Sequence, residues 1–260
     1  MNLDDAYANG AYIAGADGFV AMWAARAQAF RDETGGQLGL RYGVGEREVY
    51  DLFHPRGPAK GLMVFVHGGY WQAFDGSYWS HLARGARDLG WAVAVPSYTL
   101  APEARISEIT MQIARATSDA ATKVGGPIVL TGHSAGGHLA ARMAMPGVLP
   151  EDVAARLQKV VAISPVADLR PLLQTSMKDE LRLDAQEADA ESPVLAAPLD
   201  VAVTAWVGGD ERPAFLDQAR WLAQAWNCGH VIAAGRHHFD VIAALEQAES
   251  ALTREVVGAP

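Results

Sequence analysis

The chain has 260 residues, of which 50% are hydrophobic and 20% are charged. This composition is typical of a folded globular protein with a large core and excludes an intrinsically disordered chain. The formal net charge of −9 provides no basic surface for nucleic acid or anionic lipid. Because α/β folds of this length often form around one core, we predict a single domain over residues 1–260.

The cysteine content and the first residues of the sequence indicate the cellular compartment. Cys228 is the only cysteine, so the chain cannot form an internal disulfide or a thiolate metal cluster. The acidic start at residues 1–5 differs from a secretory signal, and no apolar run approaches membrane-spanning length. We expect a cytoplasmic protein with no membrane partner and no cofactor, and we leave a homodimer open.

Short apolar runs alternate with longer amphipathic stretches, which predicts the α/β class: a mainly parallel sheet flanked by helices. A helical segment over about residues 1–35 comes first. The expected strands are 62–66, 92–95, 128–131, 160–163, 201–207 and 231–233. The expected helices are 18–31, 106–123, 135–145, 213–226 and 240–254. Residues 168–199 interrupt this alternation of strands and helices. They predict an insertion that is either a small cap-like lid or a surface connector.

Residues 132–136 read Gly-His-Ser-Ala-Gly and match the pattern G-x-S-x-G. A predicted strand ends just before Ser134 and a predicted helix begins just after it, so the serine falls on a sharp strand-to-helix turn. Flanking glycines are expected there because such a turn is strained and leaves no room for side chains. We interpret Ser134 as a nucleophile; the alternative is a glycine-rich turn with a buried serine.

The first predicted strand is followed directly by His-Gly-Gly-Tyr-Trp at residues 67–71. Adjacent glycines leave backbone N–H groups free to approach a ligand closely. With the N–H of Ala135, they would form an oxyanion hole for the tetrahedral intermediate of acyl transfer. We expect Gly69 and Tyr70 to donate and Gly68 to shape the turn, with an ordinary strand-end turn as the alternative.

A nucleophile on such a turn is followed along the chain first by the acid and then by the histidine. His238 lies after the last predicted strand and before the last predicted helix, and it is our candidate base. We assign the adjacent His237 to loop packing or the rim of the site. His67 precedes the nucleophile, so we assign it a structural hydrogen bond.

The acid is expected after the strand 201–207, where the chain reads Gly-Gly-Asp-Glu. Either Asp210 or Glu211 can orient His238 and stabilise its imidazolium form. One of the two can instead serve as a charge or cap at the start of the helix 213–226. Glu211 is slightly favoured, and Asp210 stays open as the alternative.

Aromatic residues gather after the two glycines and either wall an aromatic substrate site or pack the loop: Tyr70, Trp71, Phe74, Tyr78 and Trp79. We assign three residues to the substrate pocket: Tyr70, Trp71 and His133. Neither H-E-x-x-H nor Cys/His ligand spacing is present, so no metal is implied. Neither G-x-G-x-x-G nor a Walker loop is present, so no nucleotide is implied.

These motifs together resemble the α/β-hydrolase fold, specifically the arylformamidases, also called kynurenine formamidases, near the hormone-sensitive-lipase-like esterases. The resemblance spans most of the chain and rests on residues 67–71, 132–137, 207–215 and 238–240. Lipase-like esterases usually have a further glycine where Tyr70 stands, whereas H-G-G-x-W is similar to the formamidase branch. The family's acid stands two residues before a proline, which lands on Glu211, although those enzymes often carry Asp there. The N-terminal region with Asp5, Tyr7 and Asn9 is also similar and would help cover the pocket.

The resemblance implies hydrolysis of N-formylkynurenine to kynurenine and formate, a step of tryptophan breakdown. The residues themselves predict attack by Ser134 on a small-molecule ester, thioester or activated amide through an acyl-enzyme, with His238 as base and then acid. A short-chain carboxylesterase or thioesterase is the alternative. A non-catalytic binding protein on the same scaffold and a metal-dependent formamidase are further alternatives.

Overall fold

The computed structural model describes residues 3–258. Its strands form one eight-stranded sheet in the order β1-β2-β4-β3-β5-β6-β7-β8. The first two pairs, β1–β2 and β2–β4, are antiparallel, and the other pairs are parallel. The strands are β1 (Gln37–Arg41), β2 (Val49–Phe53), β3 (Leu62–Val66), β4 (Ala92–Pro96), β5 (Ile128–His133), β6 (Leu157–Ile163), β7 (Ala202–Gly208) and β8 (Gly229–Ala233).

The sequence pattern predicts the six parallel-sheet strands and misses the antiparallel pair. β3, β4 and β5 are buried along their whole length, which explains why β3 and β4 are apolar throughout and why β5 begins with three apolar residues. β1 lies at the sheet edge, is mostly exposed and contains Gly39 with a φ of 67°, so it lacks an apolar signal. β2 mixes buried and half-buried positions over only five residues.

Helices cover both faces of the sheet. One face carries α4 (Ile106–Lys123), α5 (Ala135–Met143) and α9 (Pro213–Trp226), whose apolar residues share a core with the strands. The other carries α2 (Ala16–Thr34), α3 (Arg84–Asp88) and α10 (Ala251–Val257). None of the helices within residues 3–258 combines the length and apolarity needed to cross a bilayer.

The last predicted helix, 240–254, is wrong in one respect, because the structure divides it. A 3-10 helix, η6 (Val241–Glu246), comes first, and α10 begins only after Ser250. The Ser250 side chain accepts a hydrogen bond from the N–H of Thr253 and so caps a new helix start. The predicted helices 18–31 and 135–145 also shift at their ends, to the bounds of α2 and α5.

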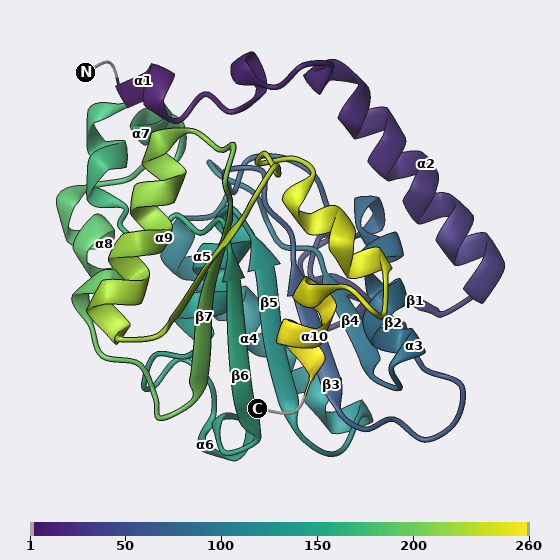
Figure 1. Ribbon diagram of the computed structural model, residues 1–260. Coiled ribbons are helices and arrows are strands. Elements are labelled where there is room, and N and C mark those ends of the chain that lie inside the picture. The colour runs from purple at the N-terminus through teal and green to yellow at the C-terminus, as the bar shows by residue number, and fades with distance from the viewer. Residues whose placement is uncertain (1–2, 259–260) are drawn as a thin grey trace.

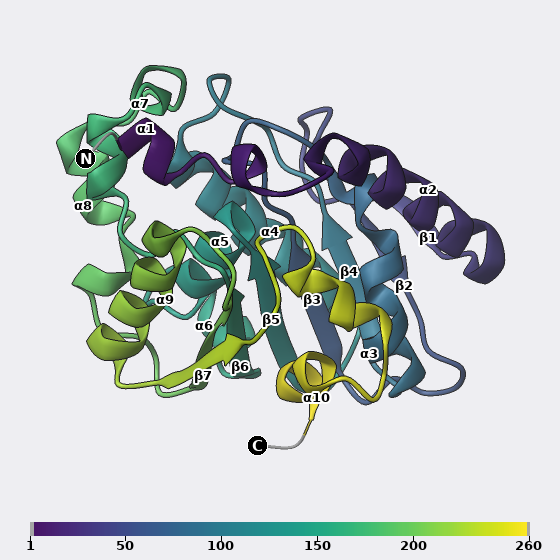
Figure 2. The same cartoon turned by 45° about the horizontal axis from the view of Figure 1, so that its top comes forward.

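The N-terminal segment crosses the carboxyl ends of the parallel strands. It consists of α1 (Leu3–Ala6), η1 (Gly10–Tyr12) and the start of α2. Figures 1 and 2 show it in purple, running from beside α7 (Met177–Glu180) across the top of the sheet to α2. Because ligands of open α/β sheets bind at the carboxyl ends of strands, this segment lies where it can cover a site.

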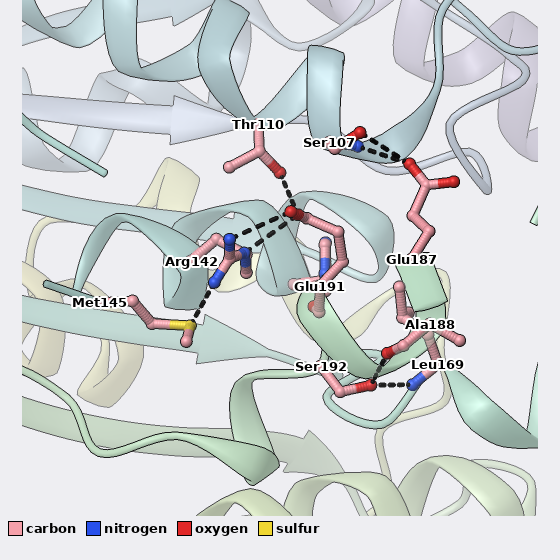
Figure 3. A network of polar contacts seen from close by, with 10 residues as sticks. Ser107, Thr110, Arg142, Met145, Leu169, Glu187, Ala188, Glu191 and Ser192 are labelled. Carbon is pink, nitrogen blue, oxygen red and sulfur yellow. Dashed lines mark hydrogen bonds and ion pairs between the residues drawn. The ribbon is translucent and has the colours of Figure 1, made fainter. Parts of the chain in front are cut away.

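Residues 168–199 form short helices beside α4 and α5 rather than one connector helix: η4 (Arg170–Gln174), α7, α8 (Ala185–Ala190) and η5 (Pro193–Leu195). Buried charge holds this insertion to the core (Figure 3). Glu191 accepts two hydrogen bonds of 3.0 Å from the Arg142 guanidinium and one of 2.7 Å from Thr110. Glu187 bonds Ser107 and Arg105 at the start of α4.

Candidate active site

Ser134 occupies a strained turn between β5 and α5. Its φ of 57° and ψ of −119° lie outside the regions that side-chain-bearing residues normally adopt. The surrounding backbone holds it there: its N–H donates to the Ile163 carbonyl at 2.9 Å, and its carbonyl accepts from the His138 N–H at 3.0 Å. The predicted strand–serine–helix turn is therefore present, with Ser134 at the carboxyl edge of the central strand.

Glycines flank Ser134 because the backbone is too crowded for a side chain. A Cβ on Gly132 would lie 2.2 Å from the Gly136 carbonyl oxygen, and a Cβ on Gly136 would lie 2.0 Å from the Val66 carbonyl oxygen. Gly68 faces the same turn, since its Cβ would lie 2.6 Å from the His133 carbonyl oxygen. The loop after β3 is thus packed directly against the serine turn.

Three consecutive residues of this loop have left-handed backbone conformations: Gly69 (φ 107°), Tyr70 (φ 50°) and Trp71 (φ 58°). The loop folds back on itself because the N–H groups of residues 72 and 73 both donate to the Gly69 carbonyl. Among residues 3–258, no backbone partner is recorded for the N–H groups of Gly69 and Tyr70. The N–H of Ala135 opens α5, where a helix has no partner of its own.

A buried hydrogen bond joins Glu211 to His238. Glu211 Oε2 accepts a 2.6 Å hydrogen bond from His238 Nδ1, and the Glu211 side chain has no exposed surface. Its other oxygen, Oε1, accepts from the Gly208 N–H at 2.8 Å and from the Ser164 hydroxyl at 2.5 Å. This carboxylate is therefore fully engaged, and the bond fixes His238 so that Nε2 is the ring nitrogen left for chemistry.

Of the two acids left open by the sequence, the structure brings Glu211 to His238 and turns Asp210 away. Asp210 is exposed, and its backbone N–H donates to the Arg236 carbonyl at 2.9 Å. Glu211, by contrast, is only 7% exposed, so of the two adjacent acids it is the buried one. Ser164 belongs to no motif in the sequence and follows β6 directly with a φ of 47°.

Ser134 and His238 line one cavity of about 520 Å³. Tyr70 and His133 also line it, as expected for pocket residues. Trp71 does not: it has no exposed surface and packs edge-on against His138, with ring centroids 5.2 Å apart, in the core beneath the loop. Besides the two histidines, the aromatic residues that line it are Tyr7, Trp23, Tyr70, Phe74, Trp79 and Phe239.

The N-terminal segment contributes part of this wall. The Tyr70 hydroxyl donates to the Tyr7 carbonyl at 2.7 Å, and Gln218 donates to the Tyr7 hydroxyl at 2.8 Å. Asp4 accepts hydrogen bonds from the backbone and hydroxyl of Ser176 in the insertion. Residues 4, 7–10, 20 and 23 line the cavity. The segment is thus bonded to both the loop after β3 and the insertion.

The other histidines near the site have different surroundings. His133 lies 4.5 Å from the His238 ring, and burial together with that neighbour holds its pKa well below the ordinary value. His67 stacks on Tyr98 at 4.2 Å and donates to the Gly68 carbonyl; burial lowers its pKa to about 4. His237 accepts backbone N–H groups of its own loop, in line with a packing role. Within residues 3–258 no three His, Cys, Asp or Glu side chains are grouped as a metal site.

A family model for the alpha/beta hydrolase fold matches residues 63–232, more than half of the chain. The chain belongs to the α/β-hydrolase family. The matched residues include the loop after β3, the serine turn and Glu211, and of the residues that line the cavity only His238, Phe239 and those of the N-terminal wall lie outside the match.

Named relatives of this hydrolase include formamidases and esterases. The kynurenine formamidase of Drosophila melanogaster is 29% identical over 78% of this chain and 74% of its own length. The kynurenine formamidase of Danio rerio is 27% identical over 73% of this chain and 68% of its own length. A Silicibacter sp. TM1040 crystal structure, provisionally named a thioesterase, is 59% identical over 98% and 99% of the two chains, with a TM-score of 0.97. A thermophilic esterase of Thermogutta terrifontis shares the fold with a TM-score of 0.62. It is 21% identical over 79% of this chain and 84% of its own. The chain is therefore a hydrolase.

Proposed function

We propose that this hydrolase cleaves a small aromatic N-formyl amide, such as N-formylkynurenine, through an acyl-enzyme on Ser134. One observation carries the proposal: Ser134 and the Glu211-bonded His238 line the same aromatic-walled cavity. Acyl transfer needs a strained serine, a histidine with one nitrogen held by a buried carboxylate, and backbone N–H groups that are free to donate.

The first half of the reaction forms the acyl-enzyme. His238 Nε2 takes the proton of Ser134 Oγ as the oxygen bonds to the formyl carbon. The N–H groups of Gly69, Tyr70 and Ala135 stabilise the negative charge on the former carbonyl oxygen. His238 then gives its proton to the amine nitrogen, the C–N bond breaks, and the arylamine leaves. Glu211 stabilises the imidazolium form throughout.

The cavity wall supports an aromatic substrate. Its aromatic residues come from the N-terminal segment, from α2, from the loop after β3 and from the loop after β8, and aromatic side chains pack favourably against a planar aromatic ligand. Of the described residues on this wall, none is Lys or Arg, and Asp4 contributes a carboxylate. This charge suits an amino acid with a positive ammonium group better than a phosphorylated acyl carrier. The two curated formamidase relatives support the same substrate class.

A thioesterase or short-chain carboxylesterase is the second candidate, because the Silicibacter protein with 59% identity carries a provisional thioesterase name. The same serine, histidine and acid serve all three reactions, so the difference lies in how the cavity receives the leaving group. A leaving group with phosphates would meet Asp4 and no Lys or Arg on the described wall.

A substrate panel tests the proposal. We expect kcat/KM for N-formylkynurenine to exceed that for p-nitrophenyl acetate, for a small thioester and for acetyl-CoA by at least about tenfold. Ser134→Ala should abolish all turnover and fluorophosphonate labelling while keeping the circular dichroism spectrum. Faster turnover of either thioester would instead favour the second candidate. Failure of the native chain to react with the fluorophosphonate would favour a binding protein.

A further inference from the structure

Several buried polar atoms of the substrate cavity have no hydrogen-bond partner. Within residues 3–258, four such atoms belong to residues that line it: Asn9 Oδ1, Gln72 Nε2, Trp79 Nε1 and His133 Nε2. The Gln72 and Trp79 atoms are donors, and Asn9 Oδ1 is an acceptor. His133 Nε2 can be either, and its surroundings decide which. Because a buried polar atom without a partner costs about 1–3 kcal/mol, we expect a bound substrate to supply partners.

The surroundings of His133 make its Nε2 an acceptor. The residue is only 5% exposed, and burial together with the nearby His238 holds the pKa of His133 well below its ordinary value, so the ring is neutral at neutral pH. The ring also forms a hydrogen bond with the His238 backbone, which raises the pKa as donation to a carbonyl does. Since Nε2 has no partner, this bond uses Nδ1. The single ring proton therefore lies on Nδ1, and Nε2 carries a lone pair.

His133 lies beside the two residues that carry out the proposed chemistry. It ends β5 and directly precedes Ser134, and its ring centroid is 4.5 Å from that of His238, with the ring planes tilted by 45°. Ser134, His133 and His238 all line the same cavity. A substrate atom that is hydrogen-bonded to His238 Nε2 is therefore within reach of the His133 ring as well.

The substrate atom that meets His238 in this way is the leaving atom. In an aryl formamide it is a nitrogen that carries one hydrogen, whereas in an ester it is an oxygen that carries none. When the tetrahedral intermediate collapses, His238 gives its proton to the lone pair of that nitrogen, so the N–H bond must point elsewhere. An N–H group in a buried site costs free energy unless it has an acceptor, and an ester oxygen has no such cost. Amide cleavage therefore benefits from an acceptor beside the catalytic histidine.

We propose that His133 is a specificity-determining residue whose Nε2 accepts a hydrogen bond from the N–H of the scissile amide and so favours amides over esters. The proposal rests on the proposed function, which it deepens. In this step the C–N bond breaks, its electron pair stays on nitrogen, and that nitrogen takes the proton from His238 Nε2. His133 holds the N–H and exchanges no proton. Because the bond keeps the nitrogen lone pair turned towards His238, it stabilises the transition state.

Two substrates with the same acyl group and the same ring test this role. Formanilide and phenyl formate both transfer a formyl group to Ser134 and differ in the leaving atom, so the ratio of their kcat/KM values measures the preference for amides. His133→Asn keeps an amide N–H near the position of Nδ1 but places no acceptor at that of Nε2. It should lower kcat/KM for formanilide by about tenfold, the loss of one hydrogen bond, and keep that for phenyl formate within about twofold.

The complementary variant is His133→Gln, whose longer side chain can place its amide oxygen at the position of Nε2. Its kcat/KM should stay within about threefold of the native value for both substrates. His230→Asn changes an exposed histidine of β8 that does not line the cavity, and it should alter neither value. Circular dichroism checks the folding of each variant, and fluorophosphonate labelling checks that Ser134 is still activated. Should His133→Asn fail to fold, His133→Leu, which also lacks an acceptor, decides the question.

Two results would overturn the proposal. Equal losses on formanilide and phenyl formate in His133→Asn would mean that His133 only positions His238, and an unchanged ratio would mean that no hydrogen bond to the amide N–H is lost. A fall in the ratio in Asn9→Ala and not in His133→Asn would assign the acceptor to Asn9 instead. A native chain that cleaves phenyl formate and no formamide would refute the proposed function itself, and this proposal with it. The native chain and the variants thus distinguish the two failures.

Discussion

Glu211 binds His238 through one carboxylate oxygen and is itself bound through the other. The 2.6 Å contact from Oε2 to His238 Nδ1 is buried, and the adjacent Asp210 has an exposed side chain. Asp210 and Glu211 are both carboxylic acids but have very different surroundings. Replacing each with its amide therefore tests which position supports catalysis.

Glu211→Gln is expected to lower kcat by roughly 10³- to 10⁴-fold, because an amide cannot stabilise the imidazolium and favours the wrong ring tautomer. Asp210→Asn, the matched control, should remain within about twofold because that side chain is exposed. Steady-state kinetics on p-nitrophenyl acetate and on N-formylkynurenine measure both. A greater loss in Asp210→Asn than in Glu211→Gln would contradict the assignment of the acid.

Ser164 supports Glu211 from the end of β6 with a 2.5 Å hydrogen bond to Oε1. Ser164→Ala removes a charge-assisted bond from a buried carboxylate, so we expect kcat/KM to fall by about tenfold. Ser118→Ala removes a hydroxyl that bonds a backbone carbonyl within α4 and should leave kcat/KM unchanged. If both variants lost activity equally, the effect of Ser164→Ala would be one of general stability.

The parallel strands and the serine turn could be predicted because the sequence encodes them locally. β5 begins with three apolar residues and is buried throughout, and no side chain fits at Gly132 or Gly136. Such features can be recognised from the sequence alone, because burial on both faces of a sheet and crowding in a turn each restrict which residue types fit at the positions concerned.

The partners of the site could not be predicted from local pattern. The choice of Glu211 over Asp210 depends on which way one turn points, and the support from Ser164 depends on the pairing of β6 with β7. The position of Trp71 just after the two glycines predicts a pocket residue, yet the residue has a left-handed φ and its side chain is buried in the core.

Tyr70→Phe tests how the N-terminal segment is held over the cavity. The substitution removes the hydroxyl bond to the Tyr7 carbonyl but keeps the ring and the backbone N–H. We expect KM for N-formylkynurenine to rise by about three- to tenfold, with kcat nearly unchanged, because the loss affects binding alone. Tyr42→Phe loses an equivalent hydroxyl bond to the Ser97 carbonyl and should leave KM unaltered. A fall in kcat without a change in KM would place Tyr70's hydroxyl in the chemical step.

The Arg142–Glu191 ion pair ties the insertion to α5, and both side chains are nearly buried. Arg142→Met leaves the Glu191 carboxylate uncompensated, so we expect the free energy of unfolding to fall by about 3–5 kcal/mol. The double variant Arg142→Met/Glu191→Leu carries no buried charge and should recover most of that loss. Urea denaturation measures both. The exposed pair Arg220–Asp217 is the control, and Arg220→Met should change stability far less. Additive losses in the double variant would contradict a coupled pair.

Three buried histidines link stability to pH. Burial lowers the pKa of His67, His81 and His138 from 6.5 to about 4, and for His81 three nearby arginines add to the effect. In the unfolded chain each of them regains a pKa near 6.5. Between these two values the unfolded state therefore binds protons that the folded state does not.

Stability should consequently be unaffected by these groups above about pH 6.5 and should fall as the pH drops from 6.5 towards 4, where the folded state also takes up the protons. Each histidine contributes at most about 1.4 kcal/mol per pH unit within that window. Urea unfolding at pH 7.5, 6.5, 5.5 and 4.5 measures the slope. His138→Gln removes one titrating group, so its slope should be shallower than that of the native chain even though its stability at pH 7.5 is lower. A slope identical to that of the native chain would mean that His138 carries its proton in the folded state.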